Sequence, residues 1–91
     1  MSDDLKARFE QASQEVTQLS QAPDNMAKLR LYALYKQASA GDCTGERPGM
    51  LNPAGRFKYD AWKALEGTSQ DDAMTQYIEF VEELKAADQQ A

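Results

Sequence analysis

The sequence predicts an all-α protein, a bundle of four helices. Three observations lead to this fold class. Apolar residues recur every three or four positions in four separate segments. Each segment is bounded by residues that cap or break helices. The chain has only five glycines and three prolines, and most of them lie between the segments. Since 91 residues suit one compact unit, we expect a single domain over residues 1–91.

The first expected helix carries its apolar side chains at intervals of four and three residues, which places them on one face. They are Leu5, Phe9, Ala12, Val16 and Leu19. The break at residues 21–24 ends this segment. Asp24 is expected to cap the next helix by accepting hydrogen bonds from the free amides of its first turn.

The second helix is expected over residues 25–40, and its apolar content is too broad for one face. One side carries Leu31, Leu34, Tyr35 and Ala38. Another side carries Leu29 and Tyr32, with Lys36 four residues after Tyr32. A helix with two such faces packs on the core with one and covers something else with the second.

Residues 41–52 form a connection with three glycines and a proline, which is long for a compact bundle. Because it includes Met50 and Leu51, we expect it to be packed against the protein. Asn52 and Pro53 are suited to the start of a third helix, as its cap and first residue. This helix should end at about Glu66, before Gly67.

The third and fourth helices have predicted buried faces of their own. In the third, Phe57, Ala61 and Leu65 should face the core. Ser69 should cap the fourth helix, with Asp72 three residues later. The apolar side of the fourth helix comprises Met74, Tyr77, Ile78, Val81 and Leu84.

Composition argues against several functions. The single cysteine excludes an internal disulfide, and the absence of histidine argues against zinc sites and common hydrolase chemistry. We therefore expect no enzyme activity and no metal. A net charge of −5 argues against nucleic-acid binding. No apolar run reaches the ~20 residues of a membrane span, and the acidic N-terminus does not resemble a secretory signal, so we expect a cytoplasmic protein that is not inserted in a membrane.

The charge is unevenly distributed. Residues 21–67 carry seven basic and five acidic side chains, whereas residues 68–91 carry one basic and six acidic side chains. Tyrosines lie among the cations, at Tyr32, Tyr35 and Lys36 and again at Lys58 and Tyr59. Solvated helix faces are the ordinary interpretation of such a pattern. The other interpretation is a site for a phosphate-bearing small ligand, whose base would stack and whose phosphates would pair with lysine.

The motifs at these positions are distinctive. They are Leu-Tyr-Ala-Leu-Tyr-Lys-Gln-Ala at residues 31–38, Glu-Arg-Pro-Gly-Met at 46–50, Lys-Tyr-Asp-Ala-Trp at 58–62 and Gly-Thr-Ser at 67–69. From about Phe9 to Leu84 the chain closely resembles the acyl-CoA-binding protein family. The resemblance implies an up-down-down-up four-helix bundle. It also implies a non-catalytic, intracellular carrier and pool former for medium- to long-chain fatty acyl-CoA esters, with no cofactor beyond the ligand.

The resemblance also implies which residues bind acyl-CoA. Tyr32, Lys36 and Lys58 would hold the adenosine 3′-phosphate, and Tyr35 would lie beside the adenine. Tyr77 would add a contact from the fourth helix. The implied set is Tyr32, Ala33, Leu34, Tyr35, Lys36, Lys58, Tyr77, Met26 and Leu29, in which the last two help to cover the acyl chain.

The sequence departs from the family pattern at Thr17, where many members have a ligand-contacting lysine, and at Tyr59, where many have tryptophan. The missing charge at Thr17 suggests a weaker hold on the headgroup. Two neighbouring residues are interpreted as structural: Trp62 as packing, and Arg47 as ordering the loop through a carboxylate.

The family expectation is a monomer that hands its ligand to acyl-CoA-consuming enzymes. The alternative function is a helical interaction module that docks a partner protein through the second apolar face of residues 25–40.

Overall fold

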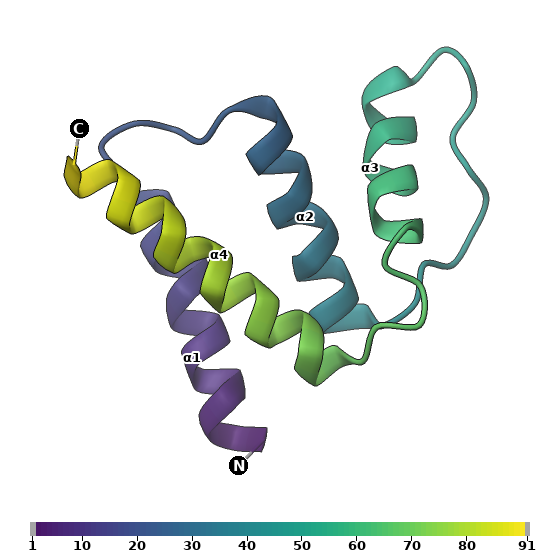
Figure 1. Cartoon of the computed structure of the whole chain (residues 1–91). Helices are drawn as coiled ribbons and strands as arrows, with labels where there is room; N and C mark the ends of the chain where they lie inside the picture. Colours follow the sequence, from purple (N-terminus) through teal and green to yellow (C-terminus); the bar gives the residue numbers. More distant parts are fainter. Residues whose placement is uncertain (1, 91) are drawn as a thin grey trace.

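The computed structural model describes residues 2–90, and the side chains of residues 3–88, as four α-helices joined by loops (Figure 1). The helices are α1 (Ser2–Glu15), α2 (Asn25–Ala40), α3 (Pro53–Lys63) and α4 (Gln70–Gln90), with a short 3₁₀ turn η1 (Val16–Gln18) after α1. The predicted all-α class is confirmed. Residues 1 and 91 of the predicted domain lie outside the described residues. No described helix is long and apolar enough to cross a membrane.

The helices follow the up-down-down-up order. In Figure 1, α1 and α4 run in one direction and α2 and α3 run in the other. Because α2 and α3 are parallel, the chain must return along the full length of α3 before that helix begins. An 11-residue helix is about 16 Å long, so a short turn could not make this connection. This geometry explains the twelve-residue loop over residues 41–52.

The predicted caps are present at the starts of three helices. Asp24 Oδ1 accepts from the Ala27 amide at 2.8 Å, and Asn52 Oδ1 accepts from the Gly55 amide at 3.1 Å. The Ser69 hydroxyl oxygen accepts from the amide of Asp72 at 3.0 Å. Each cap satisfies an amide that has no partner inside its own helix.

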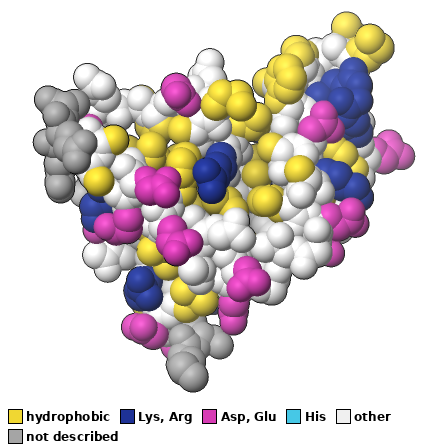
Figure 2. Space-filling model, in the orientation of Figure 1, with side chains coloured by type: hydrophobic (Ala, Val, Ile, Leu, Met, Phe, Trp, Pro, Cys, Tyr) yellow, Lys and Arg dark blue, Asp and Glu magenta, His cyan; other side chains and the backbone are white. Residues whose placement is uncertain are grey.

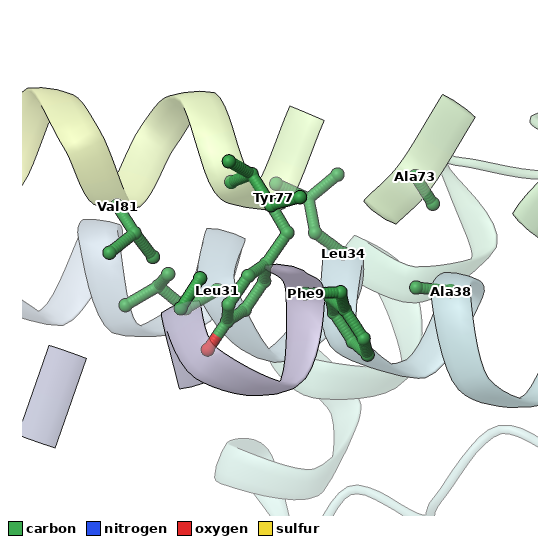
Figure 3. Close-up of a cluster of buried hydrophobic side chains, with 9 residues drawn as sticks. Phe9, Leu31, Leu34, Ala38, Ala73, Tyr77 and Val81 are labelled. Carbon is green, nitrogen blue, oxygen red and sulfur yellow. The ribbon is translucent and has the colours of Figure 1, made fainter. Parts of the chain in front are cut away.

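The hydrophobic core is built by α1, α2 and α4, with α4 packed against both of the other helices. Figure 3 shows side chains from all three meeting in this core. The buried cluster comprises Phe9, Ala12, Leu31, Leu34, Ala38, Ala73, Tyr77, Ile78 and Val81. All of these residues except Ala73 belong to the apolar faces that the sequence predicted for these helices.

Helix α3 lies to one side and packs on α2 alone among the described helices. Two predictions about it are wrong. Phe57 is 64% exposed, because no other helix covers the first turns of α3. The α-helix ends at Lys63 rather than near Glu66. After Lys63 the chain forms 3₁₀-type turns, in which the amides of Leu65 and Glu66 donate to carbonyls three residues back. These turns end at Gly67, whose φ of 92° favours glycine.

The long loop is not held as predicted. Met50 and Leu51 do not pack, since they are 84% and 101% exposed. Polar contacts to α3 hold the loop instead. Arg47 donates two hydrogen bonds to the Asp60 carboxylate at 2.9 and 2.8 Å, which confirms its predicted role. The Tyr59 hydroxyl donates to the Gly45 carbonyl at 3.2 Å.

One buried amide joins the end of α2 to the connection before α4. Gln37 is fully buried, and its Nε2 donates to Asp42 Oδ1 at 2.9 Å and to the Thr68 carbonyl at 2.7 Å. Asp42 Oδ1 also accepts from the Gly67 amide at 3.0 Å. The hydrogen bond from Gly67, followed by that from Gln37, lowers the pKa of Asp42. This network fixes the ends of α2 and α3 beside each other.

Candidate functional site

Two lysines and two aromatic rings alternate along the contact between α2 and α3. Lys58 Nζ lies 5.4 Å from the centre of the Tyr32 ring. One turn further along both helices, Lys36 Nζ lies 4.9 Å from the Trp62 ring. Because the helices are parallel, residues four apart on α2 meet residues four apart on α3 in the same order. We call these four residues the α2–α3 seam, and it brings together the predicted Tyr32, Lys36 and Lys58.

The seam lysines are available to an anion. Among the described side chains, the cations in ion pairs are Arg47, Lys63 and Lys85. Lys36 and Lys58 take part in none of these pairs, and their close contacts are with rings. A cation over a ring gains about 0.5–1 kcal/mol at an exposed site. A charge-assisted hydrogen bond to phosphate contributes more, about 1.5–3 kcal/mol, so a phosphate can draw the ammonium groups from the rings.

An apolar groove begins at this seam. It has a volume of about 510 Å³ and runs from Tyr32 and Lys58 towards the N-terminal ends of both helices. Its lining residues are Asn25, Met26, Lys28, Leu29 and Tyr32 from α2 and Ala54, Phe57 and Lys58 from α3. The predicted Met26 and Leu29 therefore lie beside the seam, in a mostly apolar groove that has Lys58 at its seam end and also includes Lys28 and Asn25 in its lining.

A second cavity of about 360 Å³ lies where α2, α3 and α4 approach one another. Met26 and Leu29 line it as well, together with Ala33 and Leu34. Ala33 and Leu34 are only 3% and 1% exposed, so they form the floor of this cavity rather than the seam. The predicted segment 32–36 is thus not one surface, since Tyr32 and Lys36 lie on the seam and Ala33 and Leu34 lie at this cavity.

Tyr35 and Tyr77 lie in a third place, an aromatic cluster with Phe9. The ring centres of Phe9 and Tyr35 are 5.3 Å apart, and those of Phe9 and Tyr77 are 5.1 Å apart. Tyr35 is 44% exposed and can offer a ring face to a ligand. Tyr77 is 4% exposed, and Figure 3 shows it within the core. Burial raises the pKa of the Tyr77 hydroxyl. Its ligand contact stays a prediction, limited to a small exposed edge.

Sequence reasoning missed two aromatic residues of the site. Phe57 was assigned to the core, yet it lines the apolar groove. Trp62 was assigned to packing, and it is indeed buried, with its Nε1 donating to the Gly41 carbonyl at 2.8 Å. Its ring has a second role that was not predicted, because it also contacts the Lys36 ammonium group. The spacing of four residues between Lys58 and Trp62 was the available signal, because it matches the spacing of Tyr32 and Lys36 on the parallel helix.

The space-filling view shows how these groups are distributed on one face. In Figure 2 apolar side chains reach the surface over α2 and α3, while acidic side chains are frequent over α1 and α4. Among the described residues no group of three or more histidine, cysteine or acidic side chains could hold a metal ion. With two lysines at the α2–α3 seam and an apolar groove beside them, the site is suited to an amphiphile with an anionic head and an apolar tail.

Known proteins share both sequence and structure with this chain. A family model described as Acyl CoA binding protein matches residues 6–81. The acyl-CoA-binding protein of Brassica napus is 48% identical over 84 residues, which cover 92% of this chain and 91% of that protein. The crystal structure of Oryza sativa acyl-CoA-binding protein 2 has a TM-score of 0.90 and 42% identity, covering 99% of this chain and 97% of the other. The solution structure of the yeast acyl coenzyme A binding protein has a TM-score of 0.70 and 44% identity, covering 87% and 92%.

Proposed function

The chain belongs to the acyl-CoA-binding protein family, and on this premise we propose that it binds medium- to long-chain fatty acyl-CoA esters as a carrier and pool former. The observation that carries the proposal is the position of the α2–α3 seam. Two lysines outside any described ion pair lie at one end of an apolar groove. An acyl-CoA has the matching order of groups, a polyanionic nucleotide followed by a hydrocarbon chain.

The headgroup is assigned to the seam. In the proposal, Tyr32, Lys36 and Lys58 hold the 3′-phosphate through charge-assisted hydrogen bonds, each contributing about 1.5–3 kcal/mol. Tyr35 covers the adenine with its exposed ring face, and Tyr77 contributes an edge. These contacts distinguish CoA esters from free fatty acids, since a carboxylate offers one charged group and no base to stack.

The acyl chain is assigned to the groove. Met26 and Leu29 cover it from α2, and Phe57 covers it from α3. Burial stabilises by about 0.8 kcal/mol per methylene, so a tail of about 15 methylenes could gain up to ~12 kcal/mol. Association and ordering of side chains cost several kcal/mol of this gain. The tail therefore supplies most of the affinity, and the headgroup supplies specificity.

No chemical step belongs to this function. A carrier shields the tail from water and releases it unchanged, so the proposal includes no catalytic residue, metal or cofactor beyond the ligand. It places a monomer in the cytoplasm, where acyl-CoA-consuming enzymes would receive the cargo. The alternative, a protein-docking module on α2, is not favoured, because the family model and the curated relatives describe acyl-CoA binding.

Isothermal titration calorimetry tests this proposal with palmitoyl-CoA, free CoA, palmitate and decanoyl-CoA. We expect palmitoyl-CoA to bind more tightly than either CoA or palmitate, and decanoyl-CoA to fall between CoA and palmitoyl-CoA. Equal affinities for palmitate and palmitoyl-CoA would show that the CoA headgroup does not contribute to binding. No association with any CoA ester at micromolar concentration would overturn the proposed function.

A further inference from the structure

The two rings of the α2–α3 seam differ in how firmly they are held. Tyr32 is half-buried, whereas Trp62 is only 9% exposed. Trp62 Nε1 also donates a hydrogen bond to the Gly41 carbonyl at 2.8 Å, well inside the usual range for such bonds. A buried indole whose single donor is engaged cannot turn its ring plane without losing that hydrogen bond. Trp62 is therefore the fixed ring of the seam.

Trp62 contacts the C-terminal end of α2 at two points. The first is the side chain of Lys36, whose Nζ lies 4.9 Å from the centre of the ring. The second is the backbone of Gly41, the residue that ends α2 and whose amide still donates to the Gln37 carbonyl at 3.0 Å. Because both points belong to the same end of one helix, the hydrogen bond to Gly41 fixes where the indole lies relative to Lys36.

The ring restricts Lys36 without using all of its hydrogen-bond donors. Lys36 takes part in none of the ion pairs among the described side chains. A lysine with no fixed contact samples many rotamers, and ordering it opposes binding. Indole attracts a cation more strongly than the other aromatic rings do, and it covers one side of an ammonium group that has three N–H donors. The remaining donors therefore stay at the seam.

We propose that Trp62 is a positioning residue for Lys36, which it orders for contact with a ligand phosphate. The indole stays in contact with the ammonium group when the ligand binds, so its attraction acts in the free and the bound protein alike and does not compete with the phosphate. This inference rests on the proposed function, in which Lys36 meets the 3′-phosphate. It goes further, because it assigns part of the discrimination for that phosphate to a ring that does not itself touch the ligand.

Nuclear magnetic resonance tests the position of Lys36 in the unaltered protein. Methylene protons that lie over the face of an indole are shifted upfield by its ring current. We expect upfield shifts for the terminal methylene groups of Lys36 in the free protein, and we expect them to persist after palmitoyl-CoA is added. Shifts typical of an unstructured lysine in the free protein would overturn the proposal, and so would their appearance on binding.

Calorimetry with palmitoyl-CoA and palmitoyl-3′-dephospho-CoA tests the effect on binding. The measured quantity is the ratio of the two affinities, which reports the contribution of the 3′-phosphate. Trp62→Leu should lower this ratio about three- to fivefold, and Trp62→Phe, which keeps a weaker ring, should give an intermediate ratio. Lys36→Met should lower the ratio about tenfold or more. In the Lys36→Met protein, Trp62→Leu should have no further effect on the ratio, because the two residues act through one contact.

The ratio separates positioning from packing. If Trp62 only packs, its loss weakens the binding of both esters equally and leaves the ratio unchanged. The matched control is Phe80→Leu, which removes a ring that lies 4.5 Å from the Arg30 guanidinium, outside the seam, and should also leave the ratio unchanged.

The outcomes distinguish this inference from the proposed function. A wild-type protein that does not prefer the ester with the 3′-phosphate would overturn both the headgroup assignment and the role of Trp62. A wild-type preference that persists in folded Trp62→Leu and Trp62→Phe proteins would overturn the role of Trp62 alone. Circular dichroism checks that each variant is folded, and if Trp62→Leu does not fold, Trp62→Phe and the Lys36 methylene shifts decide.

Discussion

Lys58 Nζ lies 5.4 Å from the centre of the Tyr32 ring, across a contact between two helices that run in the same direction. The ring attracts the ammonium group and keeps it near the seam. This attraction is weak enough for a phosphate to replace the ring as the partner of the lysine. The lysine is thus partly ordered before a ligand arrives, which reduces the entropy lost on binding.

Replacing Lys58 with methionine should weaken palmitoyl-CoA binding by about 1.5–3 kcal/mol, because the charge is lost while most of the aliphatic stem remains. Calorimetry measures this change. Lys63→Met on the same helix is the control, since Lys63 pairs with Glu66 and lies outside the seam. Equal affinities of the Lys58 variant and the wild type would exclude a contact between Lys58 and the headgroup.

Replacing Phe57 with serine should separate the tail from the headgroup. Phe57 is 64% exposed, so its loss should leave the free energy of unfolding nearly unchanged. The affinity for palmitoyl-CoA should fall by roughly 1–2 kcal/mol, while the affinity for free CoA should not change. Titrations with both ligands and a urea denaturation curve measure the three quantities. A parallel loss of affinity for free CoA would place Phe57 at the headgroup instead.

Local signals in the sequence predicted most of the fold. The caps at Asp24, Asn52 and Ser69 depend on neighbouring amides in the chain, so they could be identified from spacing alone. The core faces of α1, α2 and α4 followed from periodicity, because each of these helices packs along its length.

The errors arise where tertiary geometry decides. Phe57, Met50 and Leu51 are apolar residues in a region that has only one neighbouring helix, and periodicity cannot show that a second layer is missing. The separation of Tyr32 and Lys36 from Ala33 and Leu34 also depends on where α3 lies. Spacing predicted that Tyr32 and Lys36 share a face, but it could not show that Lys58 and Trp62 meet them.

Stability towards acid should depend on Asp42. The hydrogen bonds from Gly67 and Gln37 lower the pKa of Asp42 in the folded protein. A group whose pKa is lowered by folding stabilises the protein above its unfolded pKa, about 3.9 for aspartate, and this contribution is lost as the pH falls through the folded pKa. The pKa of Asp60 is lowered by Arg47, and that of Asp88 by Ser20, with the same sign.

The free energy of unfolding should therefore decrease as the pH falls below about 4, and Asp42→Asn should make this decrease smaller. The asparagine Oδ1 can still accept the same hydrogen bonds, so the substitution mainly removes the titration. Urea denaturation at a series of pH values between about 5 and 2 measures the slope. An unchanged slope in the variant would show that Asp42 does not contribute to acid sensitivity.

Replacing Gln37 with glutamate should reverse the local pH dependence. Gln37 Nε2 donates to both Asp42 Oδ1 and the Thr68 carbonyl, and its Oε1 is buried without a partner. A carboxylate at this position donates nothing and repels Asp42. The variant should lose roughly 2–4 kcal/mol of stability at neutral pH, because a buried charge is left beside acceptors. Burial and the neighbouring carboxylate both raise the pKa of the introduced group, so stability should be partly recovered on acidification to about pH 5.

Urea denaturation at pH 7 and pH 5 measures this recovery, and Gln14→Glu on the exposed side of α1 is the control. The control should follow the wild type at both pH values, since its carboxylate is hydrated in the folded and unfolded states alike. A Gln37 variant that is equally unstable at both pH values would have lost packing only. If stability recovers at pH 5 in the Gln37 variant alone, the link between α2 and the connection before α4 depends on a hydrogen-bond donor at position 37. The donor contacts of Gln37 with Asp42 and Thr68 would then be what holds the ends of α2 and α3 together.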